Sequence, residues 1–200
     1  YEAISRPYAL IRIKAPRQMG KSSLMTRVLH HAEKQGCRPV PIYFQQADSA
    51  VFADLTHFLQ WFCASVTYSL NLEDRIEDYW KGILGSKDKA GNYFQKYLLV
   101  EITEPLALAL DEADLIFEYP KIASDFFALL RAWHERGKNE AVWKKFRLII
   151  VHSQEVYIPY RFDGPPDHET TNQIVRQALR QSGITVTVLE YPVWFWQHWP

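Results

Sequence analysis

The stretch A-P-R-Q-M-G-K-S, residues 15–22, has the residue types of a phosphate-binding loop. Such a loop points backbone N–H groups inward, and the helix that follows it presents its positive end to the phosphates. Lys21 would reach the terminal phosphates, and the Ser22 hydroxyl would bind Mg²⁺. The predicted phosphate-binding residues are Ala15, Pro16, Arg17, Gln18, Met19, Gly20, Lys21, Ser22 and Ser23.

The loop departs from the signature G-x-x-x-x-G-K-[ST] at Ala15, where the signature has its first glycine. One methyl group at the mouth of the loop is tolerated if the local φ is negative. The alternative is an ordinary strand–turn–helix with a lysine near the start of its helix. The loop lies between an apolar strand at residues 9–14 and an amphipathic helix at 22–35, which is the context that the motif requires.

A second motif, L-A-L-A-L-D-E-A-D, places two carboxylates after a strongly apolar strand. Ligands of open α/β sheets bind at the carboxyl ends of the strands, where Asp111 and Glu112 would emerge. We predict that Asp111 holds Mg²⁺, mostly through water, and that Glu112 is the catalytic base that deprotonates the attacking water. Lys21 is the second predicted catalytic residue. Alternatively, the acidic pair simply opens a loop.

Polar residues also follow the strand that ends in R-L-I-I-V-H-S-Q-E. Ring and helicase-like ATPases carry a polar residue at the end of the strand beside the acidic one, where it senses the γ-phosphate. The candidates are His152, Ser153 and Gln154, and we favour Ser153. A polar loop without this role is an equal alternative.

The remaining pattern alternates strands with helices, which predicts a mostly parallel sheet covered on both faces. We therefore predict an α/β, three-layer P-loop NTPase fold that is incomplete at the C-terminus, with a core at residues 1–159 and an atypical helix–strand segment at 160–200. Further predicted strands are residues 38–46, 105–114, 146–155 and 184–192; further predicted helices are 51–70, 72–84, 93–103, 122–138 and 170–183; residues 85–92 are a predicted loop.

Composition limits the function further. The 200 residues suit one domain, 48% are hydrophobic, and 23 basic side chains balance 23 acidic ones, unlike a dedicated nucleic-acid binder. The two cysteines, Cys37 and Cys63, form no C-x-x-C motif, which favours a reducing cytoplasm. No apolar run is long enough to cross a bilayer. The first residue, Tyr1, suggests a piece of a longer protein.

The chain resembles the AAA-like P-loop ATPase domains of multidomain bacterial signalling proteins, which are related to the STAND NTPases. The resemblance covers residues 1–159 and rests on the stretches IKAPRQMGKSSLMTRVL, FLQWFC, LALDEADLIFEYPKIASDFFALLRAWHERGK and RLIIVHSQEVYIP. It implies that Ala15 is a family variant. It also implies ATP binding with slow hydrolysis, used as a switch beside sensor or effector domains.

Residues 161–200 instead resemble the end of an LmbE/PIG-L-like zinc deacetylase, through RFDGPPDHETTNQIVRQALRQSGITVTVLEYPVWFW. His168 matches the metal-binding histidine of that family's H-P-D-H motif, but Pro165 replaces its first histidine. One histidine cannot hold a catalytic Zn²⁺, which needs three protein ligands, so we predict no deacetylase activity. A gene fusion or a frameshift would explain the junction.

The function predicted from the sequence is Mg²⁺-dependent ATP binding and slow hydrolysis by a cytoplasmic signalling ATPase domain. Its expected partners are the nucleotide and other signalling domains or proteins, with no membrane and no clear nucleic-acid site. The alternative is a nucleotide-binding interaction module that switches shape without significant turnover, which the missing C-terminal closing region favours. A third possibility is a truncated chain that is inert alone.

Overall fold

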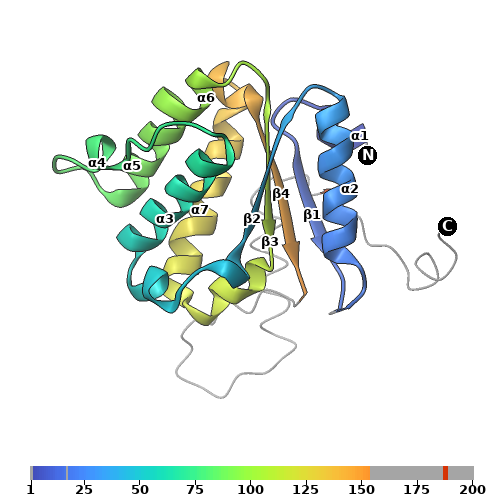
Figure 1. Cartoon of the computed structure of the whole chain (residues 1–200), viewed down its shortest axis with the longest axis horizontal. Helices are drawn as coiled ribbons and strands as arrows, with labels where there is room; N and C mark the ends of the chain where they lie inside the picture. The colour runs from blue at the N-terminus through green and yellow to red at the C-terminus, as the bar shows by residue number, and fades with distance from the viewer. Residues whose placement is uncertain (1, 17, 154–186, 189–200) are drawn as a thin grey trace, which may run out of the picture.

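The computed structural model describes residues 2–16, 18–153 and 187–188 (Figure 1). The five strands of its sheet lie in the order β2-β3-β4-β1-β5, and each neighbouring pair is parallel. The α/β fold with a parallel sheet is therefore confirmed. The strands are β1 (Leu10–Lys14), β2 (Arg38–Tyr43), β3 (Leu106–Asp111), β4 (Phe146–His152) and β5 (Thr187–Val188).

Helices cover both faces of the sheet: α2 lies on one side, and α3, α5 and α7 lie on the other (Figure 1). The α-helices are α1 (Glu2–Ser5), α2 (Lys21–Lys34), α3 (Leu55–Ser69), α4 (Ile76–Tyr79), α5 (Ser86–Tyr93), α6 (Leu99–Glu101) and α7 (Pro120–Arg136). Short 3₁₀ segments are η1 (Phe44–Gln46), η2 (Ser49–Ala53), η4 (Ala113–Glu118) and η5 (Val142–Lys145), and η3 (Phe94–Leu98) is a π-helical segment.

The side chains of strand β3 differ between the two faces of the sheet. All six of its residues are buried, because strands and helices surround it. Ala107 and Ala109 join the core beneath α2, whereas the leucines of β3 join the larger core on the opposite face. Small side chains on one face let α2 lie close to the sheet, and leucines on the other fill the space under three helices.

The outer strand β2 carries Pro39 and Pro41, which have no N–H to donate. Residues of a parallel strand point their backbone groups alternately to the two sides. The Arg38 N–H donates to the Pro105 carbonyl at 2.7 Å, on the side of β3. Positions 39 and 41 therefore face away from β3, and the prolines remove no hydrogen bond from this pairing.

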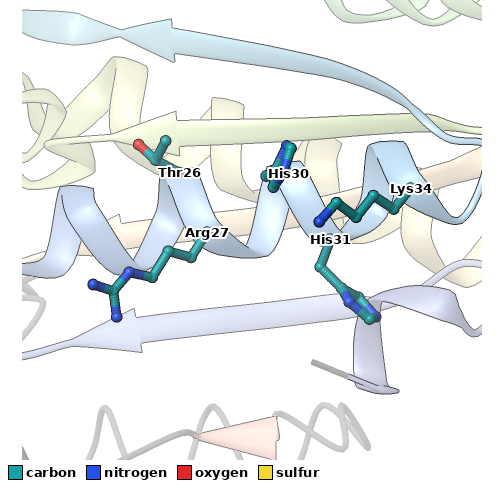
Figure 2. A pocket seen from close by; sticks show the side chains of 5 residues that line it. All are labelled: Thr26, Arg27, His30, His31 and Lys34. Atoms are coloured by element: carbon teal, nitrogen blue, oxygen red, sulfur yellow. The ribbon is translucent and has the colours of Figure 1, made fainter. Parts of the chain in front are cut away.

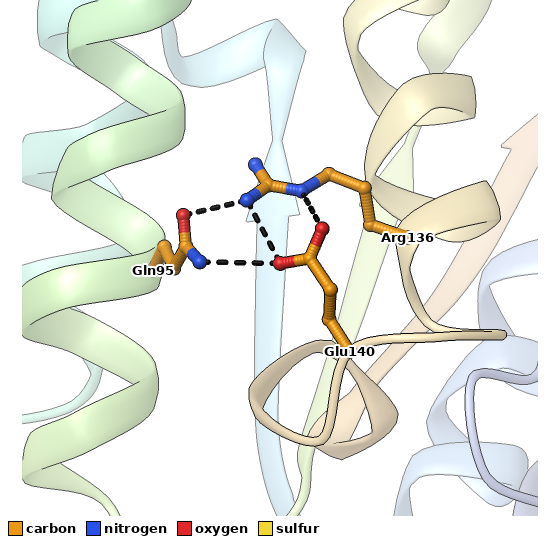
Figure 3. Close-up of polar contacts among 3 residues, drawn as sticks. All are labelled: Gln95, Arg136 and Glu140. Carbon is orange, nitrogen blue, oxygen red and sulfur yellow. Dashed lines mark hydrogen bonds and ion pairs between the residues drawn. The ribbon is translucent and has the colours of Figure 1, made fainter.

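The larger core is rich in aromatic rings. Phe126 of α7 makes edge contacts with Phe44 of η1 and with Phe58 and Phe62 of α3. Farther along α7, Arg136 forms a bidentate pair with Glu140 at 2.7 and 2.9 Å, and both also bond the amide of Gln95 in η3 (Figure 3). This network fastens the end of α7 to the neighbouring helical layer.

The prediction of a loop at residues 85–92 is wrong, because this segment forms α5. Its glycine, Gly91, is buried, and a Cβ there would lie 3.5 Å from the indole nitrogen of Trp133. Gly91 thus lies inside a helix that faces α7 rather than in a turn, and a Cβ there would make only ordinary van der Waals contact. Lys89 lies in the same segment, and its Nζ donates to the carbonyls of Trp80 and Gly82 at 2.9 Å each. These bonds tie α5 to the preceding turn.

Two predicted helices are shorter than expected. Only α4, four residues long, forms within 72–84, because the chain turns at Gly82 with φ 80°. The predicted helix 51–70 divides into η2 and α3, since Asp54 has extended backbone and accepts a hydrogen bond from the His57 N–H at 2.9 Å. The predicted helix 93–103 is confirmed over residues 93–101, with a π-helical segment at its centre.

The last predicted strand is confirmed in the part that the structure describes. The segment predicted as a strand at 184–192 contributes β5, which pairs with β1 at Ile11↔Thr187 and Arg12↔Val188. Within the described residues, none of the helices combines the length and apolar character needed to cross a membrane.

Candidate functional site

The loop between β1 and α2 turns twice into the left-handed region. Gln18 has φ 63° and Gly20 has φ 73°, with Met19 between them. Alternation of this kind turns successive backbone N–H groups toward one point and forms an anion-binding concavity. Ala15 is absent from the described residues that have positive φ, so the condition for tolerating its methyl group is met.

Lys21 is the first residue of α2, and its ammonium group folds back over the loop. Its Nζ donates to the Pro16 carbonyl at 2.9 Å, while the Leu24 N–H bonds the Gly20 carbonyl and begins the helix. The side chains of Ser22 and Ser23 are exposed in the first turn. Cation, hydroxyl and helix N-terminus thus meet at the loop, whereas Arg17 lies outside the described residues.

The acidic motif lies at the end of β3. Asp111 is buried, with 4% of its surface exposed, and its Oδ1 accepts the Glu112 N–H at 3.0 Å. Glu112 is half-buried and has left-handed backbone, with φ 55° and ψ 40°, and η4 follows it directly. The strand ends abruptly here, because a left-handed residue turns the chain out of the sheet.

At the end of β4, Ser153 contacts the acidic motif directly. Its N–H donates to Asp114 Oδ1 at 3.1 Å, and its hydroxyl donates to Asp114 Oδ2. His152 is buried and accepts a hydrogen bond from Arg12 Nε of β1. Gln154 lies outside the described residues. Of the two sensor candidates that the structure describes, Ser153 is the one with hydrogen bonds to the acidic motif.

Asp114 was missed by the reasoning from sequence. Although burial raises its pKa, the two hydrogen bonds from Ser153 hold the pKa of Asp114 below its ordinary value. The signal was present, because Asp114 is the last residue of D-E-A-D. Its partner is 39 residues away, however, and no local pattern joins the two.

The sheet brings these three segments to one edge. Strand β4 lies between β1 and β3, with Lys14 opposite His152 and Leu110 opposite Ile150. Since the strands are parallel, the phosphate-type loop, the acidic pair and Ser153 all leave the sheet at its carboxyl edge. This is where open α/β sheets bind ligands.

The donor set at this edge fits a magnesium nucleotide. The Ser22 hydroxyl and the Asp111 carboxylate are hard oxygen donors, the type that Mg²⁺ prefers. Within the described residues, no three His, Cys, Asp or Glu side chains gather as a metal site. A magnesium site that uses one or two protein ligands together with phosphate oxygens needs no such cluster.

A separate shallow hollow lies along the exposed side of α2, lined by Thr26, Arg27, His30, His31 and Lys34 (Figure 2). Thr26 is one turn beyond Ser22 and donates to its carbonyl at 2.9 Å. The hollow therefore follows the outside of the helix rather than the carboxyl edge of the sheet. It contributes no residue to the predicted nucleotide site.

The fold and this edge define a P-loop-type α/β domain. The profile of the AAA-like domain family matches residues 1–167 of the 200, and the chain belongs to that family. No curated protein matches the sequence. The relation to the STAND NTPases stays a prediction, as do the domain boundaries at 159 and 160.

Solved structures support the same fold. The ORC2 protein of Aeropyrum pernix, as ADPNP–ADP complexes, is 17% identical with a TM-score of 0.55, over 90% of this chain and 40% of that one. Its ADP form is also 17% identical, with a TM-score of 0.54 over 91% and 42%. The chain thus spans about two fifths of their length. The deacetylase resemblance, with His168 and Pro165, falls outside the described residues.

Proposed function

We propose that this AAA-like domain binds ATP with Mg²⁺ and hydrolyses it slowly, as a switch within a signalling protein. The main support is the convergence of the phosphate-type loop, the acidic pair and Ser153 at one edge of the sheet. The ORC2 neighbours, solved with ADPNP and ADP, agree with a nucleotide as the ligand. Two buried, free cysteines favour a reducing, cytoplasmic setting.

Each residue has a defined role in this proposal. Backbone N–H groups of the loop cradle the phosphates, and Lys21 leaves the Pro16 carbonyl to neutralise the terminal phosphates. Ser22 and Asp111 would hold Mg²⁺, which would supply positive charge beside the phosphate oxygens. Glu112 accepts a proton from the water that attacks the γ-phosphorus while the bond to the bridging oxygen breaks.

Thermal unfolding with ligand tests the binding. At a ligand concentration of about 100 times Kd, Mg·ATP should raise the Tm by about 5–10 °C. Lys21→Ala should abolish the rise, whereas Lys34→Ala, at the far end of the same helix, should keep it. Comparing the Tm rise with Mg·GTP to that with Mg·ATP shows whether the site distinguishes guanine from adenine. No rise in the folded wild-type chain would refute the proposal.

Turnover separates a slow ATPase from a pure switch. Glu112→Gln keeps the shape of the side chain and removes the base, so it should lower the hydrolysis rate by about 100-fold or more. Its ATP affinity should change little. If the wild type hydrolyses ATP no faster than Glu112→Gln, the domain is a nucleotide-dependent interaction module without significant turnover.

A further inference from the structure

Two hydrogen bonds fasten the end of β4 to the acidic motif. The Ser153 N–H donates to Asp114 Oδ1 at 3.1 Å, and the Ser153 hydroxyl donates to Asp114 Oδ2. We name this pair the Asp114–Ser153 clasp. It links η4, which follows β3, to the residue after β4 at the edge where the candidate nucleotide site lies.

The clasp uses the one proton that Ser153 can donate from its side chain. A hydroxyl has one donor and two lone pairs, and an ionised carboxylate only accepts. Burial raises the pKa of Asp114, but the hydrogen bonds from Ser153 outweigh this effect and hold the pKa below its ordinary value. Asp114 is therefore ionised near neutral pH. While the clasp is closed, Ser153 Oγ therefore offers only lone pairs to a third group.

The position of Ser153 makes this restriction matter. His152 lies opposite Lys14 in the sheet, so Ser153 follows beside the start of the phosphate-type loop. Ionised phosphate oxygens are acceptors and need a donor. Ser153 can donate to a terminal phosphate only if its proton leaves Asp114.

We propose that Asp114 retains the hydroxyl proton of Ser153 and thereby lowers the preference of the site for a nucleoside triphosphate over a diphosphate. Asp114 is a positioning residue, because it acts through Ser153 and does not touch the nucleotide. This inference rests on the proposed function, since it requires a nucleotide in the loop. It changes the role expected of Ser153 from an available γ-phosphate donor to one that Asp114 withholds.

Asp114→Asn tests the proposal with little change of shape. The Ser153 N–H must face the amide oxygen, so the amide nitrogen faces Ser153 Oγ and donates to it. The hydroxyl proton is then released toward the phosphate. Titration calorimetry with Mg²⁺ should show the ratio of the Kd of ADP to that of a non-hydrolysable ATP analogue rising about tenfold. The Kd of ADP itself should not change.

Two further variants identify the group through which Asp114 acts. Combining Asp114→Asn with Ser153→Ala should abolish the rise. Ser153→Ala alone should change the ratio by less than about twofold, because the wild-type hydroxyl already serves Asp114. Asp125→Asn is the matched control, because the Asp125 carboxylate on α7 pairs with Lys87 of α5 at 2.6 Å, away from the clasp. This variant should leave the ratio unaltered.

Three results would overturn the proposal. The first is an unchanged or smaller ratio in Asp114→Asn with ADP binding intact. The second is a rise that persists in the double variant. The third is a tenfold fall of the ratio in Ser153→Ala alone. This result needs no Asp114 variant, so it can be obtained even if Asp114→Asn does not fold. Failure of the proposed function looks different, because the wild type would then bind neither nucleotide.

Discussion

Glu112 has a left-handed backbone, at φ 55° and ψ 40°, in the position proposed for the catalytic base. A residue with a Cβ pays about 1 kcal/mol for this conformation, which glycine adopts freely. Glu112→Gly should therefore raise the free energy of unfolding by about 0.5–1 kcal/mol in urea titrations, and it should abolish hydrolysis. Stability and chemistry would change in opposite directions at one residue.

The control for this prediction is Glu118→Gly. Glu118 is the exposed last residue of η4, and it is absent from the described residues with positive φ. Glycine there only adds freedom to the unfolded chain, so the protein should lose about 0.5–1 kcal/mol. Equal losses from both substitutions would show that the backbone at Glu112 stores no strain.

At the scale of the elements, substituting alanine for either of two glycines, one in α5 and one at the end of α7, should change the stability of the fold in different ways. Gly137 follows α7 with an ordinary φ of −58°, but a Cβ there would lie 2.5 Å from Cβ of Tyr8. Because that neighbour is no flexible chain end, Gly137→Ala should destabilise the fold by about 1–3 kcal/mol. Calorimetric unfolding would measure the loss as a lower Tm.

Gly91→Ala provides the comparison. A Cβ at Gly91 would make ordinary contact with Trp133 Nε1 at 3.5 Å, and alanine favours the helix by about 1 kcal/mol. The variant should be as stable as the wild type or more so. A marked loss at Gly91 would show that α5 packs on α7 too tightly for even one methyl group.

The same elements show what sequence could and could not predict. Strands β1, β3 and β4 were predictable, because each is a short apolar run ending in polar residues. Helix α5 was missed, since Gly91 resembles a turn residue until the indole of Trp133 is seen beside it. The candidate site was largely predictable from its two motifs. The clasp was not, because only the sheet brings Asp114 to Ser153.

At the scale of the whole molecule, local stability should fall with distance from the centre of the sheet. All residues of β3 are buried between β2 and β4, whereas the four residues of α4 include none that is buried. Amide hydrogens of β3 should therefore exchange only through global unfolding. Those of α4 should exchange through local openings that need roughly half that free energy or less.

Hydrogen exchange followed by mass spectrometry would measure both regions, with and without ADP. Bound nucleotide should raise the opening free energy of the β3 amides by the full binding free energy. The exchange rates of the α4 amides should stay nearly unchanged. Equal protection of α4 and β3 would instead mean that the described part of the chain opens as a single unit.

The two prolines of β2 have a consequence for how copies of this domain can meet. An exposed strand edge normally invites a strand from another chain, which then extends the sheet by backbone hydrogen bonds. Pro39 and Pro41 face that outer side and leave it without two of its amide donors. Assembly of this protein by sheet extension is thus disfavoured at β2, and self-association there would have to rely on side chains.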